Sequence, residues 1–194
     1  MQTLLFVAVV LVLILIYYSE EFGLHPTIDP ENTKPFSQYR NRVITGDIIV
    51  AHNSGFISTL IRIYAQSPAT HSGVVIVEDG DIYICEIDYY SYFADDIHIS
   101  KIETFMEKQR SRYIGIIPAP KHVPLRLHDI EKIKCKFDLS MGFFTLPGRI
   151  YCTTLVHRLM SRFDILPWNG ACEHKTTPKT YHSDPSIVLL DYDR

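Results

Sequence analysis

The sequence predicts one α+β domain built on an antiparallel sheet, because apolar strands and helical repeats are mixed along it without a regular strand–helix–strand order. The clearest element is a β-hairpin, in which two apolar runs, 74–77 and 82–87, flank the turn sequence Asp79-Gly80. The chain has 194 residues, of which 46% are hydrophobic. This composition suits a soluble domain of roughly 150 residues and an additional segment.

The additional segment is expected at the N-terminus, where every residue from Leu4 to Tyr18 is apolar or aromatic. A helix of this length spans about 25 Å, slightly less than the roughly 30 Å of a bilayer core. We therefore expect residues 1–18 to form a single-pass transmembrane anchor, with the lipid bilayer as a partner and the membrane as the location. A cleaved signal peptide and a buried helix are the alternatives. The first basic residue is Lys34, so the side of the membrane is not indicated.

Residues 19–41 are expected to form a linker or an extended arm that lies on the domain. Pro26, Pro30 and Pro35 occur there among polar residues, which disfavours regular structure. The folded domain is then expected to cover residues 42–194.

The first half of the domain is expected to contain a strand, a helix and the hairpin. Residues 43–51 read as a strand that ends in an apolar run. Apolar residues at helical spacing predict a helix over 56–66, which Ser67-Pro68 ends. The hairpin follows this helix.

The second half is expected to begin with a short helix that continues to about Arg110. Ser100 and Glu103 have the spacing of a capping box at the start of this helix. The later elements follow from apolar spacing and turn residues. They are a strand over 113–117, a helix over 125–137, a loop over 141–148, a helix over 150–163 and a strand over 187–190.

Charge and cysteine usage exclude several functions. The net charge is −3 and no long basic run occurs, so nucleic-acid binding is not expected. The four cysteines are widely spaced and are expected to be free thiols: Cys85, Cys135, Cys152 and Cys172. The group of Cys172, His174 and His182 does not have a standard zinc spacing. We therefore expect neither a metal nor another cofactor.

A histidine and a cysteine, about eighty residues apart, are the strongest candidates for chemistry. His71 opens a strand, and Cys152 opens a helix. An imidazole on a strand can take the proton of a thiol, and the N–H groups and dipole at a helix start favour the thiolate and can bind an oxyanion. Taken singly, each residue more often has a structural role in a protein core.

The hairpin supplies carboxylates near the histidine. A two-residue turn at Asp79-Gly80 pairs Gly73 with Glu86 and His71 with Asp88, and it places these side chains on one face. Glu86 is then diagonal to His71 and Asp88 is directly opposite it. Either carboxylate can hold the imidazole in one tautomer and stabilise its charged form.

Three segments, in this order, resemble the circularly permuted NlpC-type papain-like family. They are 45–50 (TGDIIV), 70–87 (THSGVVIVEDGDIYICEI) and 149–159 (RIYCTTLVHRL). This family includes bacterial YiiX-like proteins, poxviral relatives and, more remotely, the lecithin retinol acyltransferase group. In it the histidine precedes the cysteine. Thr154 stands where the family commonly has an acidic residue.

The resemblance implies a permuted papain-like domain with a catalytic triad. Cys152 would be the nucleophile, His71 the general base and then acid, and Glu86 the residue that orients His71. The reaction would pass through a thioester without a cofactor.

The implied enzyme is a membrane-anchored cysteine hydrolase of the peptidase or amidase kind. The anchor makes a lipid-ester substrate, and hence an acyltransferase or phospholipase-like enzyme, an alternative. A non-catalytic membrane or virion module that retains the fold is another. Three residues are candidates for substrate binding: Tyr151, His52 and Asp88.

Overall fold

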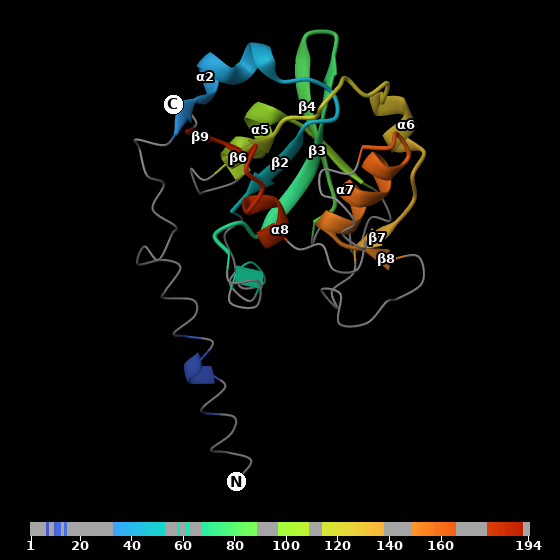
Figure 1. Ribbon diagram of the computed structural model, residues 1–194. Coiled ribbons are helices and arrows are strands. Elements are labelled where there is room, and N and C mark those ends of the chain that lie inside the picture. Colours follow the sequence, from blue (N-terminus) through green and yellow to red (C-terminus); the bar gives the residue numbers. More distant parts are fainter. Residues whose placement is uncertain are drawn as a thin grey trace.

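A computed structural model describes residues 33–52, 67–88, 97–108, 114–137, 149–165 and 178–191, together with residues 7, 10–12, 14, 58, 61 and 62. These residues form an α+β fold around a seven-stranded sheet (Figure 1). The α+β class predicted from the sequence is therefore confirmed.

The sheet has the strand order β1–β9–β6–β2–β3–β4–β5. The strands are β1 (Lys34–Pro35), β2 (Ile48–Ala51), β3 (His71–Glu78), β4 (Asp81–Glu86), β5 (His98–Lys101), β6 (Ile114–Ile117) and β9 (Val188–Asp191). Neighbouring strands are antiparallel, except that β1 runs parallel to β9. The predicted antiparallel sheet is thus present, and the edge strand β1 makes it mixed.

Outside the N-terminal residues and the helical residues 58, 61 and 62, six short helices and one small strand pair complete the described fold. The helices are α2 (Phe36–Tyr39), the 3-10 helix η2 (Arg40–Arg42), α5 (Ile102–Lys108), α6 (Leu127–Glu131), α7 (Cys152–Ser161) and α8 (Pro178–His182). The small pair is parallel and joins β7 (Lys136–Phe137) to β8 (Arg149–Ile150).

The sheet is buried on both faces by two apolar layers. In β2, Ile48 and Val50 belong to the layer that contains α7, whereas Ile49 and Ala51 belong to the layer that contains α5. Helix α7 packs on β3, and α5 packs on β4 and β5 (Figure 1). This burial on both faces explains why the strands read as continuous apolar runs rather than alternating ones.

The strand expected over 43–51 is β2, which starts later, at Ile48. The reason is that Asp47 organises a turn before it. One carboxylate oxygen of Asp47 accepts a hydrogen bond from the N–H of Ile44 at 3.0 Å, and the other accepts one from the N–H of Ala119 at 2.8 Å. Gly46 inside this turn has a φ of +104°.

The capping box expected at Ser100 is wrong. Ser100 lies in β5, where it pairs with Ile84, and its buried hydroxyl has no hydrogen-bond partner among the described residues. Helix α5 begins two residues later, and the carboxylate of Glu103 pairs with Arg40 at 2.6 Å. Cross-strand pairing with β4 therefore overrides the local capping signal.

The other expected elements are present with different bounds, except that residues 136–137 and 150 lie in short strands instead of in the expected helices. The helix expected over 125–137 is limited to α6 and is followed by β7, and the helix expected over 150–163 is α7. The final strand is β9. Residues 58, 61 and 62 are helical, and the rest of the helix expected over 56–66 lies outside the described residues, as does the loop over 141–148.

Described residues before position 42 also pack on the sheet. Strand β1 pairs with β9, and Phe36 and Tyr39 of α2 are buried in the layer that contains α5. The expected anchor over 1–18 lies outside the described residues except for residues 7, 10–12 and 14, and most of the linker lies outside them too. None of the helices in the described part of the chain has the length and apolar character needed to span a bilayer.

Two glycines with positive φ give a matched stability test. Gly46 has a φ of +104°, and a Cβ there would lie 2.3 Å from a methyl carbon of Val123. Gly80 in the hairpin turn has a φ of +83° and open space around it. We expect Gly46→Ala to lower the free energy of unfolding by about 3 kcal/mol, from backbone strain and overpacking together, and Gly80→Ala by about 1 kcal/mol from strain alone. Urea unfolding of both variants checks this, and equal losses would contradict the clash.

Candidate active site

The β3–β4 hairpin has the predicted register. It runs from the pair Glu78–Asp81 at the turn to the pair Val74–Cys85. On its other side, β4 pairs with β5, and Glu86 at the end of β4 is opposite His98. The hairpin therefore brings the ends of three strands together at one end of the sheet.

His71 is the first residue of β3 and is buried at this end of the sheet. Its Nε2 lies 2.5 Å from Oε2 of the buried Glu86, a short charge-assisted hydrogen bond. Its ring stacks on Phe105 of α5, with a centroid separation of 6.4 Å. Because Glu86 engages Nε2, Nδ1 is the ring nitrogen left to face a second group.

That second group is the thiol of Cys152, which is hydrogen-bonded to His71. Cys152 is the first residue of α7, after Tyr151 in extended conformation, and only 6% of it is exposed. Since α7 and α5 belong to different layers, His71 at the strand end contacts both layers at once. The structure thus brings Cys152, His71 and Glu86 together in this order.

The pKa values of the thiol and the imidazole shift toward an ion pair. Burial alone raises the pKa of Cys152, but the hydrogen bond and charge of His71 lower it below its ordinary value. Burial alone lowers the pKa of His71, but hydrogen bonds to Cys152 and Glu86 raise it well above its ordinary value. Cys85 is a useful contrast, because burial and then the negative charge of Glu86 both raise the pKa of its thiol. A thiolate beside an imidazolium is the reactive form of a cysteine nucleophile.

Two residues near the thiol were missed by sequence reasoning. Ser72 lies beside Cys152, and its backbone helps to lower the pKa of the thiol. Tyr181 of α8 is buried, and its hydroxyl donates a hydrogen bond to the carbonyl of Thr153 at 3.2 Å, which fixes the first turn of α7. Ser72 follows His71 directly, so its position was a usable signal, whereas no local pattern connects Tyr181 to α7.

The three residues expected to bind substrate differ in burial and in the groups that they contact. His52 is buried, and its Nδ1 lies 3.0 Å from the carbonyl oxygen of Pro68. Tyr151 is half-buried at the start of α7. Asp88 is half-buried and lies near His98 of β5. Of the two carboxylates proposed to orient His71, Glu86 is the one seen in contact with it. Thr154 is buried, and its hydroxyl has no hydrogen-bond partner within the part of the chain that the structure describes.

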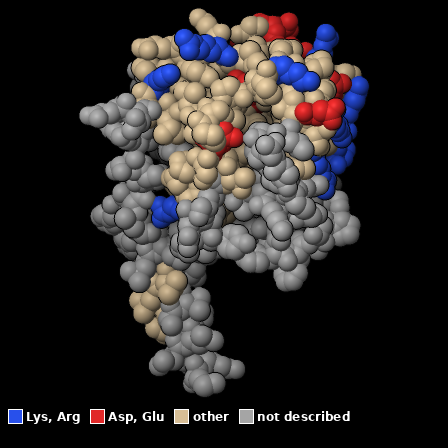
Figure 2. Space-filling model, in the orientation of Figure 1, with Lys and Arg blue, Asp and Glu red and all other residues tan. Residues whose placement is uncertain are grey.

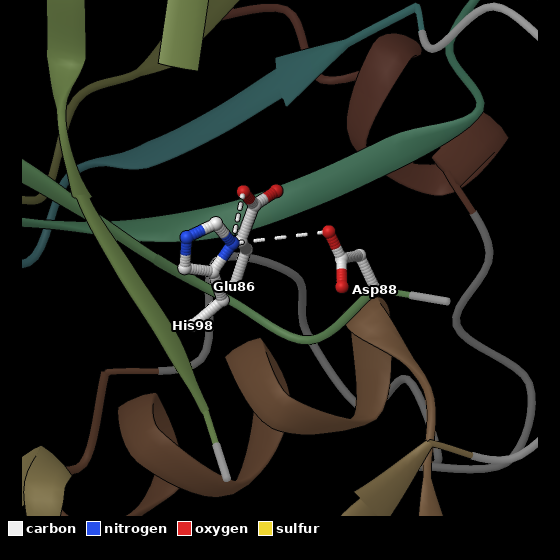
Figure 3. A group of neighbouring side chains, drawn as sticks. All are labelled: Glu86, Asp88 and His98. Carbon is white, nitrogen blue, oxygen red and sulfur yellow. Dashed lines mark ion pairs between the residues drawn. The ribbon is translucent and has the colours of Figure 1, made fainter. Parts of the chain in front are cut away.

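His98 is a further member of this cluster that the sequence did not suggest, because no strand was expected at 98–101. Its Nδ1 lies 3.6 Å from Oε1 of Glu86 and 3.8 Å from Oδ2 of Asp88 (Figure 3). Glu86 therefore faces His71 with one oxygen and His98 with the other. These three side chains contain the donor atoms of a possible metal site.

The described surface in Figure 2 carries both basic and acidic side chains on the face shown. No uniformly basic surface covers the described part of this face.

Comparison with known proteins identifies a similar fold. No family model matches this sequence, and no curated protein matches it at a significant level. Among solved structures, the chain is similar to the metalloprotein yiiX from Escherichia coli O157:H7 (DUF1105), with 13% sequence identity and a TM-score of 0.53. The match covers 77% of this chain and 97% of yiiX. At this identity the likeness shows a YiiX-like α+β fold and nothing about activity.

Proposed function

We propose that this protein is a cysteine hydrolase of permuted papain-like (NlpC-type) architecture that cleaves amide or peptide bonds. One observation supports this proposal most strongly: the buried side chain of His71 is hydrogen-bonded to both Cys152 and Glu86. The thiol of Cys152 lies at the start of α7. A structural cysteine in a core is not expected to have a hydrogen-bonded imidazole and a carboxylate behind it.

In the proposed reaction, His71 takes the thiol proton and the Cys152 sulfur attacks the carbonyl carbon of the substrate. The new C–S bond gives a tetrahedral oxyanion, which backbone N–H groups in the first turn of α7 stabilise. His71 then gives its proton to the leaving nitrogen as the C–N bond breaks, which leaves a thioester on Cys152. A water molecule, deprotonated by His71, attacks the thioester, releases the acid and restores the thiol.

Glu86 acts on His71 and not on the substrate. Its carboxylate oxygen at 2.5 Å from Nε2 holds the ring with Nδ1 toward the thiol and stabilises the imidazolium. Glu86 is 2% exposed, so water screens this interaction little.

A lipid ester is the second candidate substrate, and the apolar N-terminal segment favours it. Residues 4–18 are apolar or aromatic without interruption, and the described members of this segment include exposed apolar side chains: Val7, Leu11, Val12 and Ile14. We propose that residues 1–18 anchor the protein in a membrane, which would hold the active site near lipid substrates.

Acyl transfer to Cys152 is the test of this function. The full-length protein in detergent is incubated with p-nitroanilide amides, peptides and p-nitrophenyl or phospholipid esters, and the acid-quenched protein is mapped by mass spectrometry. We expect a thioester on Cys152 and turnover of at least one donor class, and we expect Cys152→Ala to lose both. Cys135→Ala, at another buried cysteine, is the matched control and should retain turnover.

The same experiment separates the alternatives. Preference for amides supports a peptidase or amidase, and preference for phospholipid esters supports the lipid enzyme. If no donor acylates Cys152, or if Cys152→Ala retains full turnover, the protein is not a thiol hydrolase of this kind and a non-catalytic module becomes the better description.

A further inference from the structure

We propose that Glu86, Asp88 and His98 form a binding site for a divalent transition-metal ion of the Zn²⁺ class. One ligand atom from each residue lies within 4.8 Å of the other two. Two carboxylates and one imidazole form a ligand set that zinc accepts, with a fourth position left for water or another ligand.

The distances fit an ion better than direct hydrogen bonds. The Nδ1 atom of His98 is 3.6 Å from Oε1 of Glu86 and 3.8 Å from Oδ2 of Asp88. Both separations exceed the roughly 2.7–3.2 Å of an N–H···O hydrogen bond. Ligands about 2.0–2.1 Å from a tetrahedral ion are about 3.3 Å apart, so each of the two distances from His98 exceeds this spacing by only a few tenths of an ångström.

Two of the three ligands, Glu86 and His98, are positioned by paired backbone. Glu86 ends β4, Asp88 follows it by two residues, and His98 is opposite Glu86 in the β4–β5 ladder. Figure 3 shows one ring nitrogen of His98 directed toward both carboxylates. A site held by a strand pair needs little ordering when the ion binds, which favours affinity.

Exposure increases across the site and gives an entry route for the ion. The side chain of Glu86 is 2% exposed, that of Asp88 15% and that of His98 31%. A cation can therefore reach the two outer ligands first and then the buried Glu86, whose other oxygen remains on His71.

Lys108 of α5 opposes the ion. Its Nζ lies 3.2 Å from Nε2 of His98 and 3.5 Å from Nδ1, so its positive charge is close to the site. Since Lys108 is exposed, its side chain can move away when an ion binds. Removing this charge should strengthen metal binding, and Lys108→Met is expected to bind Zn²⁺ about tenfold more tightly.

The test measures metal binding in the full chain with the competing thiol removed. Cys152→Ala protein is dialysed against Zn²⁺, and the bound metal is counted by elemental analysis. We expect one Zn²⁺ per chain that His98→Ala or Asp88→Asn weakens at least about 100-fold, while His128→Ala, at an exposed histidine of α6, has no effect. A cooperative thermal transition in each variant shows that it folds. Zn²⁺ should raise the midpoint of this transition in the Cys152→Ala protein and should leave it unchanged after His98→Ala.

Co²⁺ spectroscopy identifies the ligands. With Co²⁺ in the otherwise unchanged protein, we expect the visible d–d bands of a tetrahedral ion and no sulfur-to-cobalt charge-transfer absorption. Zn²⁺ binding that survives both His98→Ala and Asp88→Asn, or that disappears with Cys152→Ala alone, would overturn the proposal. Because Zn²⁺ binding is counted in the Cys152→Ala protein, this count does not depend on whether the protein is a hydrolase.

Discussion

His71→Ala is expected to slow the alkylation of Cys152 by iodoacetamide at pH 7 by about 100-fold or more. The thiolate is the reactive species, so the rate follows the fraction of Cys152 that is ionised. In the wild-type protein the hydrogen bond and positive charge of His71 lower the pKa of Cys152 against the opposing effect of burial. Without His71, burial acts alone.

The direction of the pH dependence follows from these causes. In the wild-type protein the rate should already be high near neutral pH and should fall only as the pH drops through the lowered pKa of Cys152. In His71→Ala, burial should move the pKa of Cys152 above the ordinary thiol value, so the rate should rise only at alkaline pH. The two profiles should therefore converge at high pH.

The measurement is the rate of alkylation at Cys152 from pH 5 to 10, followed by peptide mapping in full-length protein. His122→Ala, at an exposed histidine, is the matched control and should keep the wild-type profile. Cys85 should react much more slowly than Cys152 throughout, because burial raises the pKa of its thiol. An unchanged Cys152 profile in His71→Ala would mean that the pair does not form the reactive ion pair.

The sequence predicted the parts of this site that depend on local geometry. The Asp79-Gly80 turn determined the register of the hairpin, and this register places Glu86 near His71. Helical spacing predicted a helix over 150–163, and α7 begins two residues later than this, at Cys152. Such features depend on neighbours within a few residues, where periodicity and turn chemistry are informative.

Features that depend on distant parts of the chain were not predictable in this way. Spacing alone could not show that α7 meets β3, and only the order of the motifs suggested it. Strand β1 exists because it pairs with β9 at the other end of the chain. His98 and Tyr181 reach the site through β5 and α8, which the sequence did not suggest as elements.

Glu86 should have the second large effect, and two substitutions separate its charge from its hydrogen bond. Glu86→Gln keeps a hydrogen-bonding group beside His71 but removes the negative charge that stabilises the imidazolium. Once a substrate is identified, we expect turnover to fall by about 10²- to 10⁴-fold with the fold retained. Glu107→Gln, on the exposed part of α5, is the matched control and should retain activity.

Glu86→Leu removes the partner entirely and should destabilise the protein in a pH-dependent manner. The pKa of His71 is raised in the folded state, so protonation of His71 stabilises the fold. This stabilisation is fully present below the unfolded-state pKa of about 6.5. It is lost as the pH rises through the folded-state pKa. Leucine would leave a buried imidazolium without its carboxylate, at a cost of about 3–5 kcal/mol. The loss in free energy of unfolding should therefore be larger at pH 6 than at pH 9. Urea unfolding at both values, with Glu107→Leu for comparison, measures it, and equal losses would show that the Glu86–His71 contact acts through packing rather than charge.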